Sequence, residues 1–181
     1  GCLDAEAYRL MKRAGFRLVL FGLESANQST LDRLVKGVTV PQIEEGAKAA
    51  ARAGLDVHVT VMFGYPWEGE QEINNTVCLA RRLLRKGYAY TLQVTMVVPY
   101  PGTPLFRELD QAGLLLTKNW DDYDMRRQVM KSGVPEETIK GAVRQVYRAF
   151  LHPETIVRRL VSTRDPVADL KFYWRGLLSV A

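Results

Sequence analysis

Residues 57–68, VHVTVMF followed by GYPWE, decide the fold of this chain. Valine or phenylalanine stands at every second position of 57–63, which is the period of a β-strand, with His58, Thr60 and Met62 between them. Such a strand predicts a sheet with one apolar, covered face. Its second face either lines a ligand cavity or is a mixed interior with satisfied hydrogen bonds, and the pattern allows both.

Two similar runs, at 17–23 and 92–98, predict a strand on either side of this one along the chain. In 92–98 the polar positions are Gln93 and Thr95. Helical patterns precede or separate the strands at about 4–14, 29–36, 40–53 and 68–86. Strands that alternate with helices indicate right-handed crossovers and a parallel sheet, either open or part of a (βα) barrel. Both folds bind ligands at the carboxyl ends of their strands.

The alternation stops after residue 98. A short helix is expected at 103–109, an ordered crossing segment at 114–133, and then only helices, at 135–151, 153–162 and 166–178. The predicted fold class is therefore α/β: three parallel strands with flanking helices, a fragment of a partial (βα)6 TIM-like barrel, followed by an α-helical tail. We place the barrel part at residues 1–115 and the helical extension at 116–181.

Composition excludes several classes of protein. Of the 181 residues 47% are hydrophobic and 25% are charged, and no apolar run reaches the roughly 18 residues of a membrane span. The cysteines, Cys2 and Cys78, can form one bridge at most, which favours a reducing cytoplasm. They and the two histidines have no metal-ligand spacing, so we expect no metal site built by this chain alone.

Positive charge is concentrated in the second part of the chain. Residues 1–125 hold 14 Lys and Arg against 15 Asp and Glu, whereas residues 126–181 hold 11 against 5. Solvated faces of amphipathic helices explain this pattern. The alternative is a non-catalytic module whose basic tail binds nucleic acid.

Each predicted strand ends in an unusual segment, where a barrel keeps its ligands. The first ends in GLES (22–25), the second in FGYPWE (63–68) and the third in VPYPGTP (98–104). Glycine and proline fix the path of the backbone past a ligand, and Glu24 and Ser25 offer acceptors and a donor suited to hydroxyl groups. These features also suit a (βα) barrel lyase or aldolase, which needs no metal cluster.

In their order along the chain, the three segments resemble the radical S-adenosylmethionine (SAM) superfamily. GLES, followed by Leu31, Leu34 and the Lys36-Gly37 pair, is similar to the fourth strand of that family, 63–68 to the fifth and 99–106 to the sixth. The resemblance implies that Glu24 and Ser25 lie near the SAM ribose or its polar end. It also implies that Gly64, Tyr65, Pro66, Pro99 and Tyr100 pack against the adenine. His58, Thr60, Gln93 and Thr95 would face the substrate.

The family uses a Cys-x3-Cys-x2-Cys motif to hold a [4Fe–4S] cluster, and this motif is absent from residues 1–181. The resemblance therefore implies a parent enzyme that reductively cleaves SAM to a 5′-deoxyadenosyl radical, and a chain that is inactive alone. We expect the parent to bind a small-molecule substrate and the upstream half of the barrel, without membrane or nucleic acid. We also expect the cut sheet edge to form a homodimer.

Two segments of the tail, WDDY (120–123) and VYRAFLHPETI (146–156), resemble the C-terminal region of cobalamin-binding radical SAM proteins. That group includes the anaerobic magnesium-protoporphyrin IX monomethyl ester oxidative cyclases. Cobalamin is thus a further expected cofactor of the parent.

Overall fold

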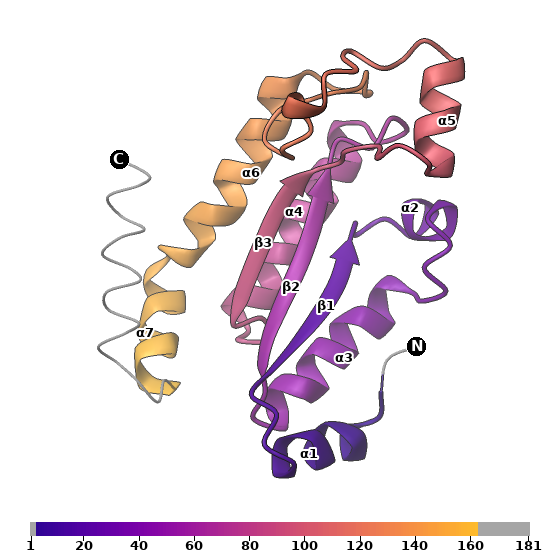
Figure 1. The fold of residues 1–181 in the computed structure, drawn as a ribbon. Coiled ribbons are helices and arrows are strands. Elements are labelled where there is room, and N and C mark those ends of the chain that lie inside the picture. The colour runs from indigo at the N-terminus through magenta and orange to yellow at the C-terminus, as the bar shows by residue number, and fades with distance from the viewer. Residues whose placement is uncertain (1–2, 163–181) are drawn as a thin grey trace.

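The three strands form one parallel sheet. The structure is a computed structural model that describes residues 3–162. In it β1 (Leu18–Glu24), β2 (Asp56–Phe63) and β3 (Thr91–Met96) lie in the order β1-β2-β3, with β2 in the middle. Figure 1 shows all three strands pointing the same way, with α2 and α5 near their carboxyl ends. The predicted fold class is confirmed: α/β, with parallel strands, flanking helices and a helical tail.

The helices occupy the segments that the sequence pattern predicted. In the barrel part they are α1 (Ala5–Arg13), α2 (Gln28–Arg33), α3 (Val40–Arg52), α4 (Glu70–Arg85) and α5 (Pro104–Gln111). A 3-10 turn, η1 (Trp120–Asp122), interrupts the irregular segment that follows, and α6 (Glu136–Phe150) and α7 (Pro153–Ser162) form the tail. The helix predicted at 166–178 lies outside the described residues.

Side-chain caps explain where several helices begin. The Asp4 carboxylate accepts from Ala7 N–H at 2.7 Å and starts α1. Thr39 and Gln42 form a reciprocal capping box at α3, each side chain accepting from the backbone N–H of the other residue. Thr103 caps α5 in the same manner, accepting from Phe106 N–H at 3.2 Å. Local sequence thus determines the starts of these three helices.

One face of the sheet carries the core. Val57, Val59, Val61 and Phe63 are buried along β2, and Leu92, Val94 and Met96 along β3. They belong to one apolar cluster with residues of α3, α4 and α6, so these helices cover this face. The apolar half of the predicted alternation is confirmed. Burying this face is the main source of stability, because each fully buried aliphatic side chain contributes on the order of 2 kcal/mol.

We call the opposite side of the sheet the open face. The register places Gly22 beside Thr60 and Thr60 beside Gln93, so the even positions of β1 and β2 share this side with the odd positions of β3. Its side chains are half-buried or exposed: Leu18 and Leu20 from β1, His58, Thr60 and Met62 from β2, and Thr91, Gln93 and Thr95 from β3.

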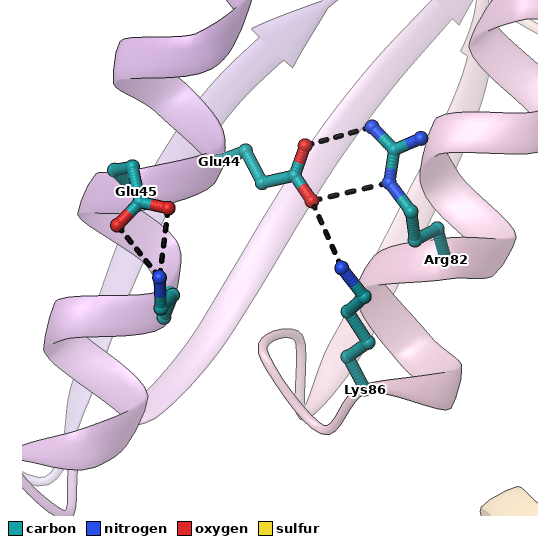
Figure 2. Close-up of polar contacts among 5 residues, drawn as sticks. Glu44, Glu45, Arg82 and Lys86 are labelled. Carbon is teal, nitrogen blue, oxygen red and sulfur yellow. Dashed lines mark hydrogen bonds and ion pairs between the residues drawn. The ribbon is translucent and has the colours of Figure 1, made fainter.

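Ion pairs join α3 to α4 on the covered side. The Glu44 carboxylate accepts from Arg82 Nε at 3.1 Å and from Arg82 Nη2 at 2.7 Å, and Lys86 Nζ lies 3.7 Å away (Figure 2). A bidentate pair fixes the relative position of two helices better than a single contact does. On the same helix Glu45 pairs with its neighbour Lys48, at 2.8 Å, and within residues 3–162 it forms no ion pair with α4.

Several predicted boundaries were wrong, and helix α2 ends at Arg33 rather than at residue 36. The third strand ends at Met96 rather than at 98, because its partner β2 ends at Phe63, whose C=O accepts the last bond, from Val97 N–H at 2.9 Å. Helix α4 begins at Glu70, after the N-cap Gly69, so Glu68 does not lie in its first turn. Glu68 N–H instead bonds to Tyr65 C=O at 3.1 Å, in a turn that directs the Glu68 side chain into the protein.

Between residues 3 and 162, no helix is both long enough and apolar enough to cross a membrane.

Candidate functional site

The carboxyl end of β1 presents a carboxylate–ammonium pair on the open face. Glu24 Oε1 lies 3.1 Å from Lys36 Nζ, and both side chains are largely but not fully buried. The pair lies over Gly22: a Cβ at that residue would collide with Glu24 Oε1 and would lie 3.0 Å from Lys36 Nζ. Gly22 is therefore part of the site, because the absence of a side chain at this position makes room for the pair.

Lys36 is a site residue that sequence reasoning did not assign. It reaches the pair because α2 is short and because Val35, at φ 53°, turns the chain at its end. Lys36 N–H bonds to Leu31 C=O at 3.0 Å and fixes that turn. One signal for this role was present in the sequence. The Lys36-Gly37 pair ends the short predicted helical segment that comes directly after the first strand.

Ser25 points the other way, into the protein. Its hydroxyl donates to Glu68 Oε1 at 2.6 Å and accepts from Asn27 Nδ2 at 2.9 Å, and the residue is fully buried. Glu24 and Ser25 are adjacent in sequence, but their side chains point in different directions. Glu24 lies on the open face, and Ser25 lies in a buried polar cluster. That Ser25 lies near SAM stays a prediction.

The buried polar cluster links the ends of β1 and β2. Glu68 Oε1 also accepts from the Thr30 hydroxyl at 2.6 Å and lies 3.4 Å from Asn27 Nδ2. Glu68 is only 1% exposed, and its Oε2 has no hydrogen-bond partner among the described residues. Sequence reasoning missed this role, because an acidic residue just before a helix reads as a favourable partner of the helix dipole.

The loop after β2 adds a buried aromatic group. Tyr65 is buried and stacks on Trp67, with ring centroids 5.2 Å apart. Burial raises the pKa of the Tyr65 phenol far above its ordinary value, and the nearby carboxylates of Glu24 and Glu68 raise it further. The phenol therefore stays protonated.

Trp67 joins this loop to α2 and α5. Its indole N–H donates to the Thr30 hydroxyl at 3.2 Å, and the Arg33 guanidinium lies 4.0 Å from the centre of its ring. Arg33 in turn pairs with Glu108 of α5 at 2.8 Å. Residues that follow all three strands are thus connected at one end of the sheet.

The remaining predicted site residues fall in two groups. In the loops, Gly64 and Pro99 are buried, Pro66 is half-buried and Tyr100 is exposed. On the open face, His58 Nδ1 lies 2.6 Å from the Thr91 hydroxyl, and Thr60 is beside Gln93 in the register. Thr95, beside Met62, is half-buried. Glu24 and Tyr65 both lie at the carboxyl ends of neighbouring strands, whereas His58 lies toward the opposite end of β2.

The described residues offer no group of three His, Cys, Asp or Glu side chains that could hold a metal ion. Cys78, a free thiol, is exposed on α4.

Comparison with known proteins gives two relatives named as methyltransferases. The chain is 33% identical over 174 residues to an uncharacterized methyltransferase of Pyrococcus horikoshii, an alignment that covers 95% of this chain and 37% of that protein. It is 29% identical over 166 residues to bacteriochlorophyllide d C-8(2)-methyltransferase of Chlorobaculum tepidum, covering 89% of this chain and 36% of that protein. The chain thus spans little more than a third of the length of either relative.

A family model also matches the part of the chain that holds β1, β2 and their carboxyl ends, including Glu24, Lys36 and Glu68. Residues 1–80 of this chain match the radical SAM superfamily.

Proposed function

We propose that this chain is part of a radical SAM enzyme and forms one side of its SAM site. The observation that carries the proposal is the Glu24–Lys36 pair over Gly22, at the carboxyl end of a strand and inside the matched residues. The pair lies on the open face of the sheet, where a ligand can reach it. Its carboxylate would accept hydrogen bonds from the ligand, and its ammonium group would donate to an acidic group of the same ligand.

SAM has the groups that such a pair would bind. Its ribose hydroxyls can donate to the Glu24 carboxylate, and its methionine carboxylate can accept from Lys36. Its adenine needs an apolar surface, and by the resemblance it would pack on the loop of Tyr65 and Pro66 and on the loop of Pro99 and Tyr100. Of these, Pro66 and Tyr100 have accessible surface in the structure, whereas Tyr65 and Pro99 are buried.

The iron–sulfur cluster does not fit the residues of this chain. A [4Fe–4S] cluster takes thiolate ligands, and within residues 3–162 the one cysteine, Cys78, lies exposed on α4. We propose that another part of the parent protein holds the cluster, which would supply the electron that cleaves SAM. This chain would contribute binding and orientation of SAM and of the substrate.

Methyl transfer is the reaction that the relatives favour. Both carry the word methyltransferase in their names, and one acts on a bacteriochlorophyllide. We propose a methyl transfer to a small-molecule substrate that faces His58, Thr60, Gln93 and Thr95, with cobalamin as a further cofactor of the parent. The cyclase type expected from the resemblance of the tail stays a prediction.

The test is SAM binding and cleavage by the full-length parent, reconstituted without oxygen. We expect E24Q and K36M each to raise the Kd for SAM about tenfold or more, which corresponds to about 1.4 kcal/mol. E45Q is the matched control, since it breaks an ion pair that stays within α3. Unchanged SAM affinity in both E24Q and K36M would contradict the proposal.

A further inference from the structure

The backbone at Glu24 is a strained turn. Glu24 has φ 59°, and Ser25 N–H bonds to Leu23 C=O at 2.7 Å, so three residues close a γ-turn of the rare positive-φ kind. The pairing of β1 with β2 shifts register at this point, between Gly22 and Glu24. Strain of this kind persists only where the surroundings hold it in place.

The residues directly after the turn are held by side chains from the loop after β2 and from α4. The hydroxyl of Ser25 donates to Glu68 Oε1 at 2.6 Å, and Ala26 N–H donates to Thr76 Oγ1 at 2.9 Å. Thr30, in α2, donates to the same Glu68 oxygen at 2.6 Å. One carboxylate oxygen therefore fixes both the exit of the turn and the helix that leads to Lys36.

Glu68 is itself firmly placed. Gly133, just before α6, packs so closely on it that a Cβ there would lie 2.6 Å from Glu68 C=O. Both hydroxyl groups that meet Oε1 can rotate, whereas the backbone of Glu68 is fixed by this contact and by its bond to Tyr65. Oε1 of Glu68 is the acceptor that the Ser25 and Thr30 hydroxyls share.

We propose that Glu68 is a positioning residue: its Oε1 holds Ser25 and Thr30, and thereby keeps the strained turn that places Glu24 over Gly22 beside Lys36. That the positioned Glu24 meets SAM rests on the proposed function. The positioning itself does not, because it concerns the backbone of the chain without any ligand.

The experiment compares glycine with alanine at position 24 by thermal unfolding. E24G and E24A both lack the carboxylate, so their difference reports the positive φ, which glycine accepts and alanine does not. With Glu68 in place, we expect the Tm of E24G to exceed that of E24A by about 2–4 °C. In the E68A background this difference should vanish or reverse, because the turn can relax. E68Q, which keeps an oxygen at Oε1, should restore it.

A merely structural role for Glu68 would lower the Tm of both variants equally and leave their difference unchanged, which would overturn the proposal. The matched control is the difference between M125G and M125A, since Met125 also has positive φ, at 62°, but lies after η1 and outside the hydrogen bonds of Glu68. E68A should not alter that difference. If E68A fails to fold, S25A replaces it, with the same reduction expected at position 24. Because no ligand is involved, the outcome is independent of whether SAM binds.

Discussion

Lys36 Nζ lies 3.1 Å from Glu24 Oε1, and both residues depend on left-handed backbone to reach that position. Glu24 has φ 59° itself, and Val35, directly before Lys36, has φ 53°. A β-branched residue in this conformation is unusual and costs on the order of 1–2 kcal/mol. Both members of the ion pair thus depend on a residue in the left-handed conformation. This indicates that the arrangement of the pair is kept although it lowers the stability of the two turns.

The empty space at Gly22 gives a direct test of the pair. G22A places a methyl group against Glu24 Oε1 and Lys36 Nζ, the far ends of two flexible side chains, so we expect the pair to separate while the free energy of unfolding changes by less than about 1 kcal/mol. The SAM affinity of the parent should nevertheless fall. Denaturant unfolding measures the first effect and calorimetry the second.

G141A serves as the control for G22A. Gly141 lies inside α6, and a Cβ there would have nothing within 4 Å. Alanine in a helix interior should raise stability by about 0.5–1 kcal/mol. If G22A bound SAM as tightly as the wild-type protein, the pair would not depend on the glycine.

The raised pKa of Tyr65 predicts how the stability of the folded protein changes at alkaline pH. Its pKa in the folded protein is raised above the ordinary value of 10.0, chiefly by burial. Below pH 10 the phenol is neutral in both states and contributes no pH dependence. Above it the unfolded chain loses the proton while the folded protein keeps it, so stability should fall by up to about 1.4 kcal/mol per pH unit.

Y65F removes this titration, so its stability should decline less steeply than that of the wild-type chain above pH 10. Denaturant unfolding at several pH values between 9 and 11 gives the slopes. Y100F is the control, because Tyr100 is exposed. Equal slopes for Y65F and the wild-type chain would mean that Tyr65 ionises freely in the folded state.

Sequence predicted the sheet because strand alternation is a local signal. Val57 to Phe63 could be assigned to one face without knowledge of any partner. The position of Glu24 at the carboxyl end of the sheet could be predicted because strand ends meet at one edge of a parallel sheet. The direction of Ser25 could not be predicted, since the γ-turn at Glu24 redirects the chain just where the alternation would otherwise continue.

The roles of Lys36 and Glu68 could not be predicted from the sequence for a related reason. Lys36 reaches the site through a left-handed valine, against the preference of that residue. Glu68 has the same local sequence as a residue in the first turn of a helix, and only contacts with Ser25 and Thr30, about 40 positions away, bury it. Both positions are determined by tertiary structure.

This chain alone is predicted to assemble no iron–sulfur cluster and to cleave no SAM, because it lacks the three-cysteine motif. Without the cluster, its affinity for SAM should be on the order of millimolar or absent. Anaerobic incubation with iron and sulfide, followed by iron analysis and an assay for 5′-deoxyadenosine, tests the first part. Stoichiometric iron with SAM cleavage, or micromolar SAM binding, would contradict the prediction.

The edge of the sheet gives the last prediction. β1 is an edge strand, and on the open face beside that edge Leu18 and Leu20 are 49% and 64% exposed. The backbone groups of an edge strand that do not face β2 are available to pair with another strand, and apolar neighbours favour this. Arg17 is the one charged residue next to this run, and it is engaged with Asp56 at 3.2 Å.

We therefore propose that the isolated chain forms a homodimer through β1, and that in the parent the same edge pairs with the upstream half of the barrel. Light scattering over a concentration series should give a dimer mass that falls toward the monomer on dilution. L20K, which puts a charge beside the edge without touching the covered core, should shift the equilibrium to monomer at every concentration. The control is V161K, on the exposed side of α7, which should leave the mass unchanged. A wild-type chain that is monomeric throughout the series would refute the dimer, because the exposed edge would then be tolerated without a partner.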